Sequence, residues 1–228
     1  MTPEAARAAL LGGFAILDRH GLGARVAGHL THRHPGREAF WTHRFGLGFH
    51  EVTEASLVLA DFDLRVLEGE GGINPTMHIH AQIYRARPDV QAIAHTHGAN
   101  VTALSATDAA FVACSQMGGL FHDDILTVDE AELIVLDRSA GAAMAEALGL
   151  RAAVILRNHG CLVVGADMPT TVLRTLALEE ACEVQLKAMA TGRMRGMDAA
   201  AARQVKDFVL RPEIVRAYWD YELRQCRR

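Results

Sequence analysis

The chain lacks both a surplus of charge of one sign and any long apolar run. Its 228 residues include 23 Lys and Arg against 27 Asp and Glu, which gives a formal net charge of −4. A mildly acidic chain has no basic face for a phosphate backbone, and its apolar runs are much shorter than the roughly 20 residues of a membrane span. Met1–Arg7 shows no secretory pattern. We therefore expect neither nucleic-acid nor membrane partners.

Cysteine is also scarce, and no linker is evident. The four cysteines are scattered and form no CxxC motif: Cys114, Cys161, Cys182 and Cys226. This pattern, without an export signal, predicts free thiols and a cytoplasmic location. Because no stretch rich in Gly, Pro or Ser divides the sequence, we expect residues 1–228 to form a single domain. What the sequence has in number is histidine, with twelve residues.

The order of elements predicts a sheet covered by helices on both faces. The first helix is expected to begin after Thr2 and to end before Gly21. Predicted strands are Glu38–Thr42, Leu57–Phe62, Arg65–Glu68, Val90–His97, Phe111–Cys114, Ile125–Val128, Ala152–Leu156 and Leu162–Val164. Predicted helices are Met77–Ala86, Asn100–Ser105, Ser139–Leu148, Pro169–Ala190, Met197–Val209 and Pro212–Arg224. Strands and helices are mixed irregularly, which argues against a regular βαβ series.

His95 and His97 form the sharpest local signal. On a strand, side chains two residues apart project from one face, about 6.6 Å apart along the chain, so both imidazoles can converge on one ion. A metal also needs ligands from elsewhere, and His159 lies in a tight turn between two buried strands. The spacing alone leaves open that these are ordinary histidines bonded to the backbone.

Longer motifs around these histidines resemble a known family. The run HxxIYRARPDVxAxxHTH from His80 to His97 and the sequence RNHG ending at Gly160 are specific. With the GHLT and FGL segments, they make residues 28–190 similar to the class II aldolase/adducin-head family. The resemblance implies a three-layer α/β/α fold with a mixed, largely antiparallel sheet, assembled as a homotetramer with active sites at subunit interfaces. It also implies that His95, His97 and His159 bind one divalent metal per chain, usually zinc, with manganese or iron as alternatives.

The sequence departs from the sugar-phosphate aldolases of this family at their catalytic glutamate. That position is Thr76 here, and no Asp or Glu lies between Gly71 and Tyr84. A threonine cannot act as a general base near neutral pH. His78 is a candidate replacement as acid or base, with a half-buried helix histidine as the alternative. We expect His80 to be mainly structural.

The phosphate-binding segments of the aldolases are also altered. Hydroxyl and amide donors are replaced by His29, His43 and Arg44. An arginine binds a carboxylate through two parallel hydrogen bonds, which favours a small, non-phosphorylated carboxylate substrate. Arg44 as a plain surface residue remains open. The predicted substrate-binding residues are His29, His43, Arg44, Asn74 and Thr76.

Retaining the metal ligands without the base favours decarboxylation. Loss of CO₂ generates the carbanion without deprotonating carbon, and a Lewis-acidic metal stabilises it as an enolate. We predict a divalent-metal-dependent carbon–carbon lyase that decarboxylates a hydroxylated carboxylic acid, aromatic acids included. Candidate proton donors besides His78 are His122, Tyr218 and Tyr221, each with a structural role as the alternative.

Three other functions stay open. They are an aldolase of a non-phosphorylated hydroxy or keto acid, an Fe(II)-dependent oxygenase on the same scaffold, and a non-catalytic adducin-like interaction module. Three neutral imidazoles hold iron as well as zinc, so ligand type does not separate the lyase from the oxygenase. The remaining acidic residues of the long helix, Glu179, Glu180 and Glu183, are expected to form a solvated face or interface ion pairs.

Overall fold

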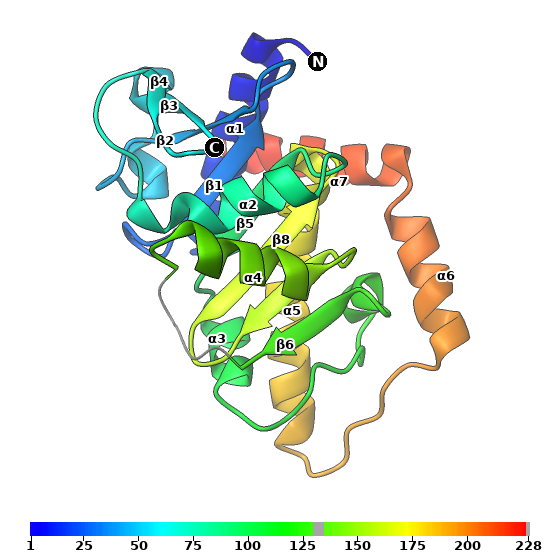
Figure 1. Ribbon diagram of the computed structural model, residues 1–228. Coiled ribbons are helices and arrows are strands. Elements are labelled where there is room, and N and C mark those ends of the chain that lie inside the picture. Colours follow the sequence, from blue (N-terminus) through cyan, green and yellow to red (C-terminus); the bar gives the residue numbers. More distant parts are fainter. Residues whose placement is uncertain (130–134, 227–228) are drawn as a thin grey trace.

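The computed structural model describes residues 1–129 and 135–226, and a mixed sheet with helices on both faces dominates it (Figure 1). The strands are β1 (His29–Arg33), β2 (Ala39–His43), β3 (Leu57–Asp61), β4 (Val66–Glu68), β5 (Ala92–Thr96), β6 (Ile125–Val128), β7 (Ala153–Leu156) and β8 (Gly160–Gly165). The helices are α1 (Pro3–Arg19), α2 (His78–Ala86), α3 (Ala99–Ser105), α4 (Arg138–Leu148), α5 (Met168–Met189), α6 (Ala199–Val209) and α7 (Pro212–Cys226).

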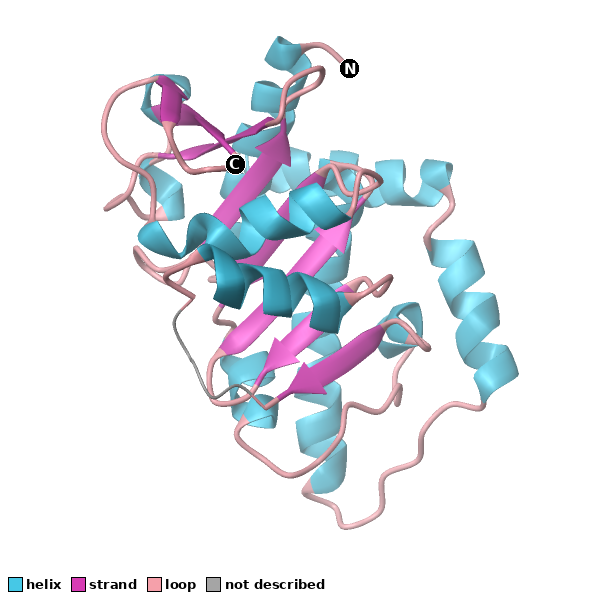
Figure 2. Ribbon diagram, viewed as in Figure 1, coloured by secondary structure: helices cyan, strands magenta, loops and turns pink. Residues whose placement is uncertain are grey.

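The sheet follows the order β4-β3-β2-β1-β5-β8-β7-β6. Its neighbouring strands are antiparallel except for β6 and β7, which run parallel. Helices α2 and α4 pack together over one face, and α1, α3 and α5 cover the other (Figure 2). The predicted class, a three-layer α/β/α fold with a largely antiparallel mixed sheet, is confirmed.

The pleat of β5 sends alternate side chains to opposite layers. Ile93 packs with Phe40 and Tyr84 on the α2 side, whereas Ala92 and Ala94 pack in the cluster beneath α1. By the same alternation, His95 projects toward the α2 layer. The candidate site lies at this end of β5.

Capping residues fix the helix ends that the sequence predicted. Thr2 Oγ1 accepts a hydrogen bond from Ala5 N at 3.2 Å, which caps α1. Gly21 follows the end of that helix with φ of 71°, a conformation that favours glycine. Asp167 caps α5 by accepting from Thr170 N at 2.7 Å. Most predicted boundaries therefore agree with the structure to within two or three residues.

One predicted strand is wrong and one strand was missed. The segment Phe111–Cys114 is irregular, because its backbone pairs with a side chain and a loop instead of a strand. Gln185 Oε1 accepts from Val112 N at 2.9 Å, and Ala113 O accepts from Met197 N at 2.7 Å. The missed strand is β1, whose polar sequence conceals a central strand between β2 and β5.

The cysteines agree with the prediction of free thiols. Cys161 and Cys182 are buried, and burial raises the pKa of the Cys161 thiol to about 12. No helix in the described part of the chain combines the length and the apolar character that crossing a bilayer requires.

Candidate metal centre and substrate cavity

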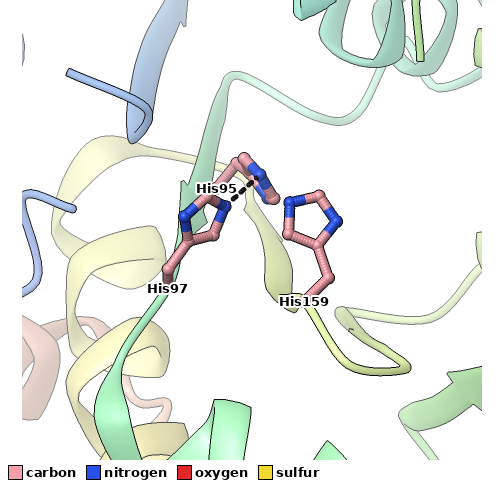
Figure 3. A group of neighbouring side chains, drawn as sticks. All are labelled: His95, His97 and His159. Carbon is pink, nitrogen blue, oxygen red and sulfur yellow. Dashed lines mark hydrogen bonds between the residues drawn. The ribbon is translucent and has the colours of Figure 1, made fainter. Parts of the chain in front are cut away.

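Three histidines converge at the end of β5. His95 lies in β5, His97 follows it directly, and His159 lies in the turn between β7 and β8. Figure 3 shows the three rings turned toward one another. One nitrogen of each ring lies within 4.8 Å of the others, and the Nε2 atoms of His95 and His97 are 3.0 Å apart. The rings therefore converge in the way that the family resemblance implied, and their role as metal ligands stays a prediction.

The turn that carries His159 depends on backbone geometry. Asn158 has φ of 56°, in the left-handed region that asparagine tolerates better than most residues. His159 N then donates to Leu156 O at 3.1 Å and closes the turn. At Gly160 a Cβ atom would collide with Thr96 O, so only glycine allows the turn to lie this close to β5.

The hydrogen bond of His95 fixes which nitrogen faces the other two rings. Its Nδ1 donates to the carbonyl oxygen of Cys161 at 2.9 Å, since a carbonyl can only accept. A neutral imidazole with a proton on Nδ1 has its lone pair on Nε2, which is the atom near His97. A backbone partner behind a ligand ring is the usual arrangement for metal-binding histidines.

Burial keeps these imidazoles neutral at physiological pH. Desolvation, followed by repulsion from neighbouring histidines, lowers the pKa of His95 well below 6.5. Burial and repulsion from His159 lower the pKa of His97 to about 4, and burial lowers the pKa of His159. Metal ligation requires neutral imidazole, so the donor set fits a divalent cation.

A cavity of about 260 Å³ opens beside the three rings. Its lining residues are Ala27, His29, Asn74, Thr76, Ile79, His95, His97, Val135, Leu156 and His159. Among the described residues that form this lining, none is acidic and none is Lys or Arg. The cavity therefore combines imidazole nitrogens and two small polar side chains with an apolar wall.

His29, Thr76 and Asn74 form a hydrogen-bonded group in the cavity wall. The register of β1 and β5 places His29 opposite His95, with ring centroids 5.0 Å apart. Thr76 Oγ1 donates to Asn74 Oδ1 at 2.8 Å and lies 3.0 Å from His29 Nε2. A hydroxyl has one proton, so His29 Nε2 is the donor in the second bond and the lone pair of His29 is on Nδ1.

Of the predicted substrate-binding residues, His43 and Arg44 lie outside the cavity lining. His43 packs edge-on against Phe14 and Phe49, with ring centroids 5.0 and 5.8 Å apart. Arg44 is exposed and lies against Gly71, where a Cβ atom would come within 2.5 Å of Arg44 Cδ. Within one chain, the cavity therefore lacks the arginine that the sequence suggested for binding a carboxylate.

The predicted proton donors also lie outside the lining formed by one chain. His78 opens α2 and its backbone carbonyl faces Gly141 of α4. His122 Nε2 lies 3.2 Å from a carboxylate oxygen of Asp123. Tyr218 and Tyr221 lie on α7, where they are 38% and 49% exposed. Their proposed roles stay predictions.

The sequence did not single out the apolar wall of the cavity. Ala27, Ile79, Val135 and Leu156 come from four separate segments and belong to residue types that also fill the core. Leu156 alone had a local signal, since it directly precedes the RNHG turn.

Comparisons with known proteins agree with this geometry. A protein-family model described as Class II Aldolase and Adducin N-terminal domain matches residues 8–186, which is well over half of the chain. The protein belongs to this family.

Three similar proteins illustrate the range of the family. Decarboxylase NovR of Streptomyces niveus is 33% identical over 181 residues, which span 78% of this chain and 67% of that protein. The 4-hydroxy-3-prenylphenylpyruvate oxygenase/4-hydroxy-3-prenylbenzoate synthase of Streptomyces roseochromogenus subsp. oscitans is 32% identical over 181 residues, 78% of this chain and 65% of that one. The structure of L-fuculose 1-phosphate aldolase from Glaciozyma antarctica PI12 superposes with a TM-score of 0.88 at 29% identity, over 98% of this chain and 89% of that one.

Proposed function

We propose that the protein is a divalent-metal-dependent carbon–carbon lyase that decarboxylates a small hydroxylated carboxylic acid. The observation that carries this proposal is the pairing of three convergent imidazoles with a cavity whose described lining has no carboxylate. Such a site has ligands for a Lewis acid, and its described lining residues include no carboxylate that could remove a proton from carbon. A relative named as a decarboxylase supports the same direction.

His95, His97 and His159 are the proposed ligands, for one metal per chain. Zinc suits three imidazoles best, and manganese or iron are the alternatives. A bound divalent cation would supply Lewis-acid polarisation of a substrate oxygen next to the bond that breaks. A purely imidazole ligand set leaves the cation its full charge for this purpose.

The other cavity residues would bind and orient the substrate. His29, Asn74 and Thr76 present polar groups to one side of the substrate, while Ile79 and Leu156 offer an apolar surface that excludes water and suits an aromatic ring. Cleavage of the bond to the carboxylate leaves its electron pair on the substrate carbon, and CO₂ departs. A proton must then be returned to that carbon.

We propose that this proton comes from His78, His122 or Tyr221. None of these lines the cavity within one chain, so the proposal includes a homotetramer in which a neighbouring subunit completes the site. Tyr221 on α7 is 49% exposed, which makes the residue accessible to another subunit. The expected location of this assembly is the cytoplasm.

Release of CO₂ from a panel of hydroxylated aromatic and aliphatic carboxylic acids tests the proposal. We expect release that a chelator abolishes and that added zinc or manganese restores. His159→Ala should remove the activity, while His50→Ala, a change at an exposed histidine, should leave it unchanged. Formation of an aldehyde without CO₂ would replace the decarboxylase by the aldolase alternative.

An Fe(II)-dependent oxygenase is the second candidate, because a relative is named as an oxygenase and imidazoles also bind iron. Oxygen consumption in step with substrate loss would support this candidate. Turnover at full rate under strict anaerobiosis would end it.

A further inference from the structure

Glu179 of α5 holds the beginning of α3. Its Oε1 accepts from the backbone N and the side-chain Nδ2 of Asn100, at 2.8 and 2.9 Å. Its Oε2 accepts from Val101 N at 3.0 Å. The expectation that this residue belongs to a solvated face is therefore wrong, because its carboxylate binds the first amide groups of another helix.

Gly98 makes this approach possible. The residue directly follows His97, and a Cβ atom there would collide with Glu179 Oε2. Its φ of −56° and ψ of 144° are angles that any residue adopts, so the need for glycine comes from the carboxylate and not from the backbone. The carboxylate of Glu179 therefore packs directly against Gly98, the residue that follows the proposed ligand His97.

The same short helix also holds the turn that carries His159. Thr102 Oγ1 donates to His159 O at 3.1 Å, and Ser105 O accepts from Asn158 N at 3.4 Å. Helix α3 therefore starts two residues after His97 and bonds to the backbone of His159. A helix this short has little stability of its own, so a charged side chain at its first amide groups contributes much of its order.

We propose that Glu179 is a positioning residue for the three-histidine site. It fixes α3 from outside the cavity, and α3 in turn sets the separation between His97 and His159. This inference rests on the proposed metal site, since the separation matters only if both rings bind one ion. Partners that orient metal ligands commonly change metal affinity by 10–100-fold when they are removed.

Zinc affinity of the metal-free full-length protein tests this role without an activity assay. The affinity is measured by competition with a chromophoric chelator, and the d–d spectrum of added Co²⁺ reports the ligand geometry. We expect Glu179→Ala to weaken zinc binding by about 10–100-fold and to alter the Co²⁺ spectrum. Glu180→Ala, at the exposed neighbouring position, is the matched control and should match wild type in both measurements. Glu179→Gln, which retains one acceptor oxygen, should lie between wild type and alanine.

Unchanged zinc affinity in Glu179→Ala, with only a lower unfolding midpoint, would overturn the inference and leave Glu179 a stabilising cap. If that variant does not fold, Gly98→Ala decides, because it leaves Glu179 in place and displaces its carboxylate. Gly98→Ala is expected to weaken zinc binding in the same range, and wild-type affinity there overturns the inference. If the wild-type protein itself binds neither zinc nor Co²⁺, the proposed metal site is refuted as well. The wild-type measurement thus distinguishes failure of the metal site from failure of the role assigned to Glu179.

Discussion

At the scale of single residues, one hydroxyl group connects two side chains of the cavity wall. Thr76 Oγ1 donates to Asn74 and accepts from His29, and Asn74 Oδ1 also accepts from Thr76 N at 3.0 Å. His29 is 2% exposed, so its ring depends on this bond for its polar contact on the Nε2 side. Thr76 therefore has a role of its own and is more than a substitute for a missing glutamate.

Replacing Thr76 with valine should reduce catalysis without abolishing it. Thr76→Val keeps the shape of the side chain but leaves His29 Nε2 unpaired, which costs about 1–3 kcal/mol for a buried polar group. We expect kcat/KM for CO₂ release to fall about tenfold, with the metal content unchanged. Thr76→Ser retains the hydroxyl and should keep most of the activity. Equal activity of the valine and wild-type proteins would contradict this role.

The residues of the site differ in how far the sequence could predict them. His95, His97 and His159 could be identified from the sequence because they lie in recognisable motifs. A strand and a tight turn leave the direction of a side chain little freedom, so the local sequence was sufficient. The packing of His43 against α1 and the contact of Glu179 with α3 depend on how separate elements meet. Local pattern carries no information on such contacts, so the sequence assigned both residues to the wrong surroundings.

At the scale of elements, Thr31 of β1 is hydrogen-bonded to two side chains of α2. Its Oγ1 lies 2.9 Å from His80 Nδ1 and 2.8 Å from the hydroxyl of Tyr84, and all three side chains are buried. Burial raises the pKa of Tyr84, so its hydroxyl is neutral and able to donate. This bond network agrees with the expectation that His80 is mainly structural.

Removing the hydroxyl of Thr31 should destabilise the fold. Thr31→Val leaves two buried polar groups without their shared partner, and we expect the free energy of unfolding to fall by about 2 kcal/mol or more. Urea unfolding of metal-free protein measures this change. Thr127→Val, at an exposed strand position of β6, is the control and should change stability by less than about 0.5 kcal/mol. A similar effect of both changes would contradict the anchoring role.

Element types were predictable where the pattern of apolar residues was regular. Helix α1 has a capping residue and periodic apolar positions, whereas α5 is apolar on most of its surface and is marked by its cap Asp167 and by Pro169 in its first turn. The predicted positions of both helices agree with the structure. Strand β1 was missed because its histidines and threonine are buried by partners from α2 and β5, which a single-strand pattern does not show. Phe111–Cys114 has an apolar pattern, but no strand among the residues that the structure describes pairs with it.

At the scale of the whole molecule, buried neutral histidines link stability to pH. Burial lowers the pKa of His29, His80 and His95 well below 6.5, and that of His43 to about 4. The unfolded chain therefore binds protons below pH 6.5 that the folded chain does not bind. Stability from these groups is present above pH 6.5 and is lost as the pH falls toward their folded values.

The free energy of unfolding of the metal-free protein should therefore fall already at mildly acidic pH. Each of these histidines is expected to lower the free energy of unfolding by about 1 kcal/mol between pH 7.5 and 5.5. Urea unfolding in the presence of chelator at the two pH values measures the sum. His43→Phe removes one such group from a site lined by Phe14 and Phe49, and should make the loss smaller. A stability that does not change between these pH values would refute the account.

The central claim for the whole molecule is a metal held by three histidines. The most direct test is the metal content per chain of protein purified without a metal-affinity step or chelator, for wild type and for His159→Ala. We predict about one zinc or manganese per wild-type chain and a marked loss in the variant, whereas about one iron per chain would favour the oxygenase over the lyase. Wild-type protein that contains no metal and takes up none when it is added would contradict the claim.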